Sequence, residues 1–320
     1  MTRHCSVTAA CLALGLGLLL ANDALARAPS VQAGKKRTEL IVPLTLQDLT
    51  GKSNVALSVA MVPAEDFFGM GLMIGGQYSA SIVSVGLSLP MALAKPDKID
   101  ARFVIGNPNI DVRLHHCFEG DVTVCVGGSV AAGFGVMEVE SDEDDGFGGG
   151  SSNGNEEKTL TRLLAWTSGL MGYQDPLYFA PETAVIRPLA LAGIFVSDFQ
   201  AQAEVGPSIL VPMLNTGGRD TEVMLLYRLA AAYRVARWVA PILEFSGMTP
   251  MTDEDGDSES ELFLNLGLRF MSKSGAMPAI RLTFPLEEHE KGMPYVHVFV
   301  GLTYQFGKGK GGSSRRSLFR

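Results

Sequence analysis

The feature that most constrains this chain is a strict alternation of apolar with small or polar residues, clearest in SIVSVGLSLPM at 81–91. The stretch lies in a window, 67–94, that contains no charged residue. A period of two residues predicts a β-strand, because successive side chains of a strand point to opposite faces. A strand in water can alternate because one face is wet, and a membrane helix has no reason to alternate. The window therefore raises the question of where the protein resides.

The same alternation recurs along the chain and predicts twelve strands. Most of them match the length of about 9–11 residues that a membrane-crossing β-strand needs. They cover 54–62, 69–78, 82–94, 102–116, 121–134, 183–196, 199–211, 221–235, 237–247, 260–271, 278–286 and 294–306. Pro188, Pro207 and Pro241 fall inside these segments, where each removes a backbone donor and can mark a bulge.

The links between the strands alternate in length. The short ones lie near 79–81, 117–120, 197–198, 236 and 272–277, and the longer ones cover 63–68, 95–101, 135–182, 212–220, 248–259 and 287–293. Short turns on one side and long loops on the other are typical of an outer-membrane barrel whose turns face the periplasm. We therefore predict an all-β fold, a closed antiparallel transmembrane β-barrel over 54–306. The alternative is a secreted β-sandwich, which would have shorter strands and no such asymmetry of its loops.

Aromatic residues support the barrel independently. On the apolar face, some lie near the turn ends of strands and others near the loop ends, as two girdles at headgroup level would require. The first group is Tyr78, Phe199, Tyr233, Phe270, Tyr304 and Phe306, and the second is Phe68, Phe134, Phe245 and Phe284.

The N-terminus has the pattern of a secretory signal. Arg3 and His4 precede an apolar run at 7–21, and Ala26-Arg27-Ala28 forms an A-x-A cleavage site. We predict a signal peptide at 1–28, a periplasmic N-terminal segment at 29–53 and a basic disordered tail at 307–320. The formal net charge of −8 argues against nucleic-acid binding, which needs a basic footprint.

Two resemblances add to this interpretation. Residues 294–306, PYVHVFVGLTYQF, resemble the terminal strand signal of bacterial outer-membrane proteins, and this resemblance implies recognition by the barrel-assembly machinery. The signal positions are Val298, Val300, Leu302, Tyr304 and Phe306. More loosely, SVGLSLP at 84–90, GNPNIDVRLHH at 106–116 with EGD at 119–121, and RLTFPL at 281–286 resemble transporter-like barrels grouped with the phenol meta-cleavage pathway proteins. That family implies an outer-membrane role in the passage of hydrophobic small molecules.

The polar face of the strands should line the barrel interior. Its charged members and histidines are Asp111, Arg113, His115, Arg187, Glu204, Glu222, Arg228, Arg234, Glu244, Arg269, Arg281 and His297. Opposed acids and bases across a narrow barrel could form a selectivity constriction. Equally, they could form a satisfied polar network that fills the barrel and holds it rigid.

Two other sites are hypothesised from local spacing. Cys117 and Cys125 flank a turn near Gly120 and would face each other, so an oxidising compartment favours a disulfide over two buried thiols. An acidic run contains Asp253, Asp255, Asp257 and Glu259 at alternate positions, where oxygen ligands could bind a divalent cation. The more common explanation of such a run is a solvated loop. We predict no metal and no cofactor.

The longest loop, 135–182, contains an acidic run, a Gly/Ser stretch and an amphipathic helix over 156–171. That helix could fold into the mouth of the barrel, lie on the outer leaflet or pack on neighbouring loops.

The sequence thus predicts an outer-membrane protein that gives passage to small molecules, hydrophobic ones among them, with membrane lipids and the assembly machinery as its partners. One alternative is a closed structural barrel that presents acidic loops. Another is a lipid-modifying enzyme, for which His289 lies in an outer loop, but no G-x-S-x-G elbow is present. We therefore predict that the chain is not an enzyme.

Overall fold

The structure, a computed structural model, describes most of the region from residue 52 to residue 306. The described residues are 52–63, 67–80, 82–96, 101–118, 120–135, 164–165, 167, 174–180, 182–213, 220–252, 260–286 and 296–306. The predicted signal peptide, the C-terminal tail and the acidic run at 253–259 lie outside them.

Thirteen β-strands make up the described part of the chain. They are β1 (Ser53–Pro63), β2 (Phe67–Ala80), β3 (Val83–Pro96), β4 (Arg102–Ile105), β5 (Asn109–Phe118), β6 (Thr123–Phe134), β7 (Thr183–Val196), β8 (Phe199–Pro212), β9 (Glu222–Tyr233), β10 (Val239–Pro250), β11 (Glu261–Phe270), β12 (Ala276–Pro285) and β13 (His297–Phe306).

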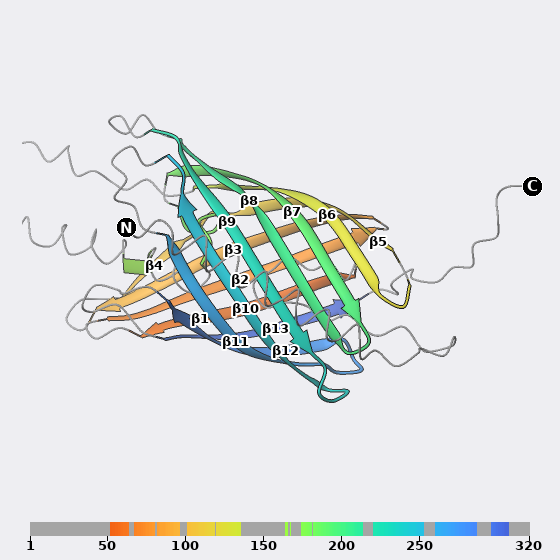
Figure 1. Ribbon diagram of the computed structural model, residues 1–320. Coiled ribbons are helices and arrows are strands. Elements are labelled where there is room, and N and C mark those ends of the chain that lie inside the picture. The colour runs from red at the N-terminus through yellow and green to blue at the C-terminus, as the bar shows by residue number, and fades with distance from the viewer. Residues whose placement is uncertain are drawn as a thin grey trace, which may run out of the picture.

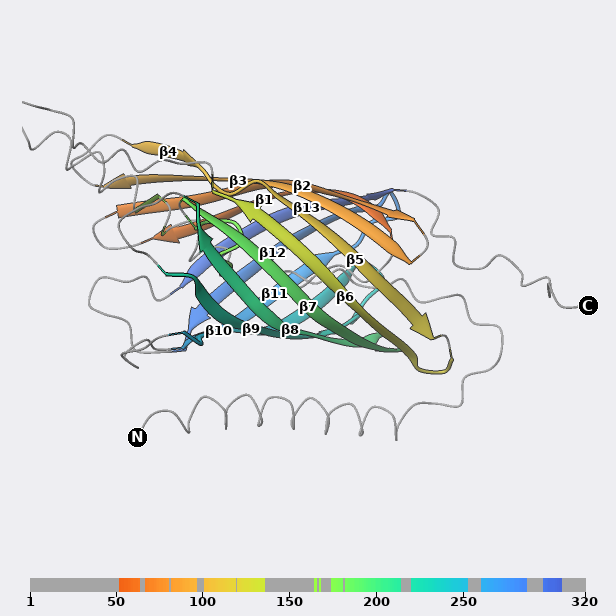
Figure 2. The same ribbon diagram turned by 90° about the horizontal axis from the view of Figure 1, so that it is seen from above.

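The strands form one closed antiparallel barrel of twelve strands, with β4 as an extra strand (Figures 1 and 2). Each of the twelve barrel strands pairs with the next barrel strand in the sequence, with β3 pairing to both β4 and β5. β1 closes the ring by pairing with β13 from Ser53 opposite Phe306 to Met61 opposite Val298. The predicted fold class is thus confirmed. Closure leaves no strand edge within the ring, which is what a sheet inside a hydrocarbon layer requires.

The alternation in the sequence separates an outer from an inner face. In β3, Leu87 is 62% exposed on the outer face, whereas Ser84 on the inner face is fully buried. Apolar residues with large exposed fractions recur on the outer face of every strand pair, for example Leu57, Val130 and Val300. A continuous apolar belt of this kind faces acyl chains rather than water.

The predicted strand 102–116 is divided in the structure, and this corrects the sequence prediction. β4 pairs with β3 so that Met91 opposes Ile105, whereas β5 pairs with β3 so that Ser88 opposes Asn109. The two registers differ by one residue, so 106–108 form a β-bulge. An uninterrupted alternation across 102–116 would place Val104 on the wrong face, because the extra residue shifts the parity.

The prolines lie within strands as predicted. Pro188 in β7 and Pro207 in β8 stand opposite each other in register, because the pairs on either side, Ile186 with Ile209 and Ala190 with Val205, keep the same offset. The β7–β8 ladder is interrupted between these two pairs, where neither proline has an N–H to donate. Pro241 remains paired with Leu268 in the neighbouring strand β11.

Aromatic side chains are exposed at both ends of the outer face. Tyr78, Tyr233 and Phe306 lie at the short-turn end, and Phe68 and Phe134 lie at the loop end. Trp238, in the β9–β10 turn, adds to the first group and stacks on Phe270 with ring centroids 6.1 Å apart. None of the described residues belongs to a helix that is long and apolar enough to cross a membrane.

Candidate functional site in the barrel interior

The inner face of the barrel is divided into a filled part and an accessible part. From β5 to β12, nearly all inward-facing side chains in the middle of the strands are buried. On β13, β1, β2 and β3, a group of inward-facing residues is partly exposed. We call this group the inner strip; it consists of Ala56, Ser58, Met73, Gly75, Ser88, Gly301 and Thr303.

Apolar side chains fill much of the interior beside β7. Leu189, Leu191 and Phe195 point inward from β7 and pack with Leu226 and Met248. Arg187 is the only residue of this strand that the sequence predicted to line the lumen. Since β7 has apolar residues at both odd and even positions, it shows little alternation. The sequence pattern therefore does not indicate which of its apolar residues point inward.

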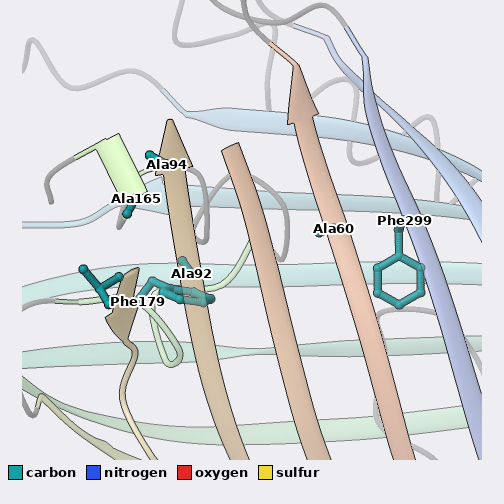
Figure 3. Close-up of a cluster of buried hydrophobic side chains, with 7 residues drawn as sticks. Ala60, Ala92, Ala94, Ala165, Phe179 and Phe299 are labelled. Atoms are coloured by element: carbon teal, nitrogen blue, oxygen red, sulfur yellow. The ribbon is translucent and has the colours of Figure 1, made fainter. Parts of the chain in front are cut away.

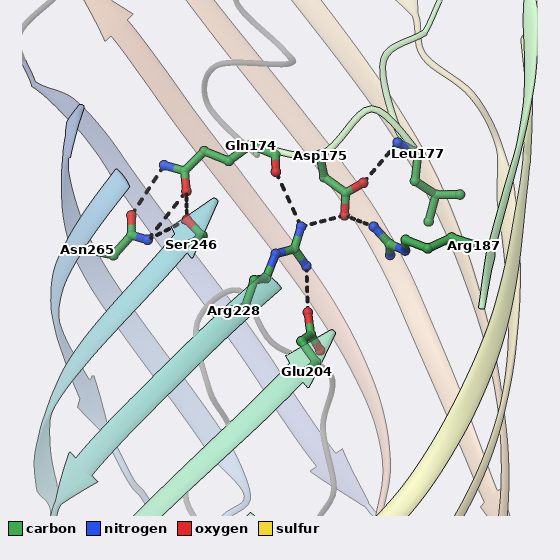
Figure 4. Close-up of polar contacts among 8 residues, drawn as sticks. All are labelled: Gln174, Asp175, Leu177, Arg187, Glu204, Arg228, Ser246 and Asn265. Carbon is green, nitrogen blue, oxygen red and sulfur yellow. Dashed lines mark hydrogen bonds and ion pairs between the residues drawn. The ribbon is translucent and has the colours of Figure 1, made fainter. Parts of the chain in front are cut away.

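A segment of the long loop enters the interior and fills the rest of this side. We call residues 174–180 the plug. Asp175 of the plug accepts hydrogen bonds from Arg187 of β7 and from Arg228 of β9, the latter at 2.7 Å (Figure 4). The Arg228 guanidinium also donates to Glu204 of β8 at 2.9 Å. All four side chains are buried, so this cluster is a charge-neutralised network rather than a set of surface ion pairs.

Polar side chains of the adjacent strands β10 to β12 hold the plug as well. Ser246 of β10 donates to the Gln174 Oε1 at 2.7 Å, and Gln174 contacts the Asn265 amide of β11 (Figure 4). Asn265 in turn accepts a hydrogen bond from Thr283 of β12 at 2.6 Å. The plug is therefore bonded to six strands, β7 to β12, directly or through one further side chain.

The charges of the network keep Asp175 ionised. Burial by itself raises the pKa of the Asp175 carboxyl, but the positive charges and hydrogen bonds of Arg187 and Arg228 outweigh it, and the pKa lies below its ordinary value. Burial and the charge of Asp175 raise the pKa of Tyr178 to about 12, so its phenol is neutral at physiological pH.

Two glycines seat the plug against the wall. A Cβ at Gly133 of β6 would lie 2.5 Å from the Leu177 carbonyl oxygen, and a Cβ at Gly106 would lie 2.5 Å from the Tyr178 carbonyl oxygen. The backbone N–H of Asn107 donates to that same Tyr178 oxygen at 2.7 Å. The β-bulge at 106–108 thus supplies both the space and a hydrogen-bond donor for the plug.

The inner strip ends, on its loop side, at a row of apolar residues. Register pairs connect Phe299 to Ala60, Ala60 to Gly71, Gly71 to Ala92 and Ala92 to Val104. We call these five residues the apolar row. All are buried, and Phe179 of the plug and Ala165 pack in the same cluster (Figure 3).

The structure distributes the predicted interior residues over several places. Asp111, Arg113 and His115 lie on the inner face of β5, where Arg113 donates to Asp111 at 3.1 Å and to Gln77 at 3.1 Å. Arg187, Glu204 and Arg228 meet in one cluster with Asp175. Glu244, Arg269, Arg281 and His297 are buried on β10 to β13, Arg234 is half-buried after β9, and Glu222 is exposed at the loop end of β9.

The remaining predicted features have separate outcomes. Cys117 and Cys125 form a disulfide that joins β5 to β6. Leu164, Ala165 and Thr167 are helical, and the rest of the predicted helix at 156–171 lies outside the described residues. Of the residues that the structure describes, no three histidine, cysteine or acidic side chains gather as metal ligands would. His289 is not among the described residues.

Gln174 and Asp175 are the functional candidates that the alternation missed. They lie in a loop, where no periodicity indicates which residues point inward. One signal was present in the sequence, since YQDPLYFAP at 173–181 is a single aspartate within an aromatic and apolar stretch. Such a composition is unusual for a solvated outer loop.

Comparison with known proteins finds similar architectures among solved structures only. No protein-family model matches the chain, and no curated protein matches it. Among solved structures, it is similar to the COG4313 outer membrane channel from Pseudomonas putida F1, with 7% sequence identity, a TM-score of 0.55 and coverage of 87% of this chain and 100% of that chain. The fold is that of an outer-membrane β-barrel.

Two further structures are more distant. The NanC porin has 6% sequence identity and a TM-score of 0.49, and the KdgM porin has 9% and 0.39; each comparison covers 79% of this chain and 100% of the porin. Sequence identity this low supports the fold alone. The resemblance to the phenol meta-cleavage pathway proteins stays a prediction, since no family model matches.

Proposed function

We propose that this outer-membrane barrel gives passage to small molecules and that their route follows the inner strip. The observation that carries the proposal is the division of the interior. Seven inward-facing residues of the strip are partly exposed, while the inner face across the barrel is buried under the plug and the side chains of β7. A passage in this barrel therefore runs off-centre, along β13, β1, β2 and β3.

The size of the barrel is consistent with a narrow passage. Twelve strands lie between small barrels of about eight strands, which side chains fill, and porins of about 16 strands, which hold an aqueous channel. The plug removes one side of this lumen. What remains suits small solutes and not large hydrophilic ones.

The chemistry of the strip favours solutes with little polarity. Ala56, Met73, Gly75 and Gly301 present apolar or backbone surface, and the side chains of Ser58, Ser88 and Thr303 add only hydroxyl groups. Pockets of this composition bind apolar bodies and orient them by a few hydrogen bonds. The proposed solutes are therefore small, uncharged and largely apolar molecules.

Entry of an apolar dye into intact cells tests the passage. Gram-negative cells that express the chain should take up N-phenyl-1-naphthylamine faster than cells without it. Ser58→Trp places a large ring in the strip and should abolish the difference. Leu57→Trp is the matched control, because the neighbouring residue lies on the outer face and is 47% exposed. Equal uptake with and without the chain would refute the proposal.

A closed structural barrel is the second candidate. It is favoured by the buried network of Asp175, Arg187 and Arg228 and by the apolar packing of Leu191 and Phe195. The same dye experiment separates the two, since a closed barrel admits no dye and is indifferent to Ser58→Trp. We propose no catalytic role.

A further inference from the structure

We infer that the apolar row, together with Phe179, is the element that selects solutes, admitting apolar molecules and excluding ions. The inference rests on the proposed passage along the inner strip and names the residues that set its specificity. It follows from the position of the row, from its composition and from the way in which Phe299 is held.

The row lies where access along the strip stops. Ser58, Met73 and Gly301 are partly exposed, and two residues further towards the loops Ala60, Gly71 and Phe299 are buried. On three adjacent strands, β13, β1 and β2, exposure is thus lost between one inward-facing residue and the next. A solute that moves along the strip therefore meets the row directly.

The composition of the row excludes charged and hydrated solutes. Its five residues carry no polar side-chain atom, and Ala94, Ala165 and Phe179 extend the same apolar cluster. An ion would have to lose its hydration shell there without a replacement ligand, which is very costly. Hydrophobic constrictions in channels close to ions by losing their water. An apolar solute is favoured there, because releasing the water around its apolar surface lowers the free energy.

Phe299 is held in position from two sides. The Arg281 guanidinium lies 4.5 Å from the centre of the Phe299 ring, within cation–π range. A Cβ at Gly301 would lie 2.9 Å from the ring carbon Cε1 of Phe299, so the ring extends over Gly301 towards the accessible part of the strip. Ala60, Gly71 and Ala92, which follow it along the row, are small, so removal of the Phe299 ring should widen the row.

A pair of related dyes tests the selection. N-phenyl-1-naphthylamine and 1-anilino-8-naphthalenesulfonate share one ring system, and only the second carries a charge. Cells that express the wild-type chain should take up the first and exclude the second. Phe299→Ala should admit the sulfonate and raise the KCl conductance of the reconstituted protein by about tenfold or more, the change that a barrier lowered by about 1.4 kcal/mol produces.

Phe195→Ala is the matched control. Phe195 and Phe299 both point inward and both are 7% exposed, but Phe195 packs in the filled part of the barrel. Its truncation should leave sulfonate uptake and conductance at the wild-type level. Should Phe299→Ala fail to fold, Ala92→Ser adds one hydroxyl to the row at almost constant volume, with Ala131→Ser on the inner face of β6 as its control.

The outcomes that overturn the inference differ from those that overturn the passage. Wild-type cells that admit both dyes equally would show that the row does not select against charge. Unchanged sulfonate entry and conductance in both Phe299→Ala and Ala92→Ser, or an equal rise in Phe195→Ala, would show that the row is not the barrier. Failure of the passage itself appears separately, as uptake of the neutral dye no higher than in cells without the chain.

Discussion

Asp175 and Arg228 form a 2.7 Å ion pair between the plug and the barrel wall, across 53 residues of sequence. Arg228 donates through its other terminal nitrogen to Glu204 of the adjacent strand. The plug is thus tied to a pair of neighbouring strands through one guanidinium. The plug is accordingly a fixed part of the interior.

Asp175→Asn should destabilise the folded barrel. The substitution leaves Arg187 and Arg228 buried with one acidic partner fewer, and removal of one member of a buried ion pair costs about 3–5 kcal/mol. The free energy of unfolding in lipid vesicles, measured with urea, should fall by roughly this amount. Asp198→Asn, in the exposed β7–β8 turn, is the control and should stay within about 0.5 kcal/mol of the wild type.

The contribution of Asp175 should persist through mild acid. Its pKa is lowered in the folded protein, so the stabilisation is complete above the ordinary aspartate pKa of about 3.9 and is lost only as the pH falls through the lower, folded value. The difference in unfolding free energy between wild type and Asp175→Asn should therefore be constant from about pH 8 to pH 5 and shrink below about pH 4. A difference that disappears near pH 6 would contradict the charge network.

Gly133→Ala should displace the plug from the wall. The new methyl group would lie 2.5 Å from the Leu177 carbonyl oxygen, which is backbone and cannot rotate away. Amide exchange at Leu177, whose N–H donates to Asp175 at 2.9 Å, should become faster. Gly76→Ala is the control, because its Cβ would meet only ordinary contacts of 3.5 Å or more. Unchanged exchange in Gly133→Ala would indicate that the plug is not seated on β6.

Two adjacent residues of β3 test which face of the sheet contacts lipid. Leu87→Lys places a charge on the outer face, where a lysine near the middle of a bilayer costs about 2–4 kcal/mol. Ser88→Lys places the same charge in the partly exposed inner strip and should cost clearly less. Urea unfolding of both variants in vesicles gives the comparison, and equal costs would mean that the two faces do not differ in environment.

The strand pattern was predictable because it depends on local chemistry. Residues such as Leu87 and Ser84 show by themselves which face they occupy, since lipid accepts only apolar side chains. The closure of β1 on β13 follows from the need to pair every backbone group in lipid. The pattern of β7 and β8 is also recognisable despite Pro188 and Pro207, because the residues on both sides of each proline still fit a strand.

The interior was less predictable because its chemistry depends on distant contacts. The extra residue at 106–108 changes the parity of β4 without changing its composition. Asp175 lies in a loop, and its position is set by Arg187 and Arg228, which are distant in sequence. The apolar row consists of residues from five strands that become neighbours only through the register, so no single segment indicates it.

The pairing of β1 with β13 has a consequence for how the barrel is built. A chain that ends before β13 would leave β1 and β12 with bare backbone edges, and hydrocarbon provides no water to satisfy them. Membrane insertion and closure of the barrel therefore have to be completed together. The ten residues of β13 complete the ring by pairing with both β12 and β1. A truncation before His297 should consequently remove the whole protein from the membrane and not merely one strand.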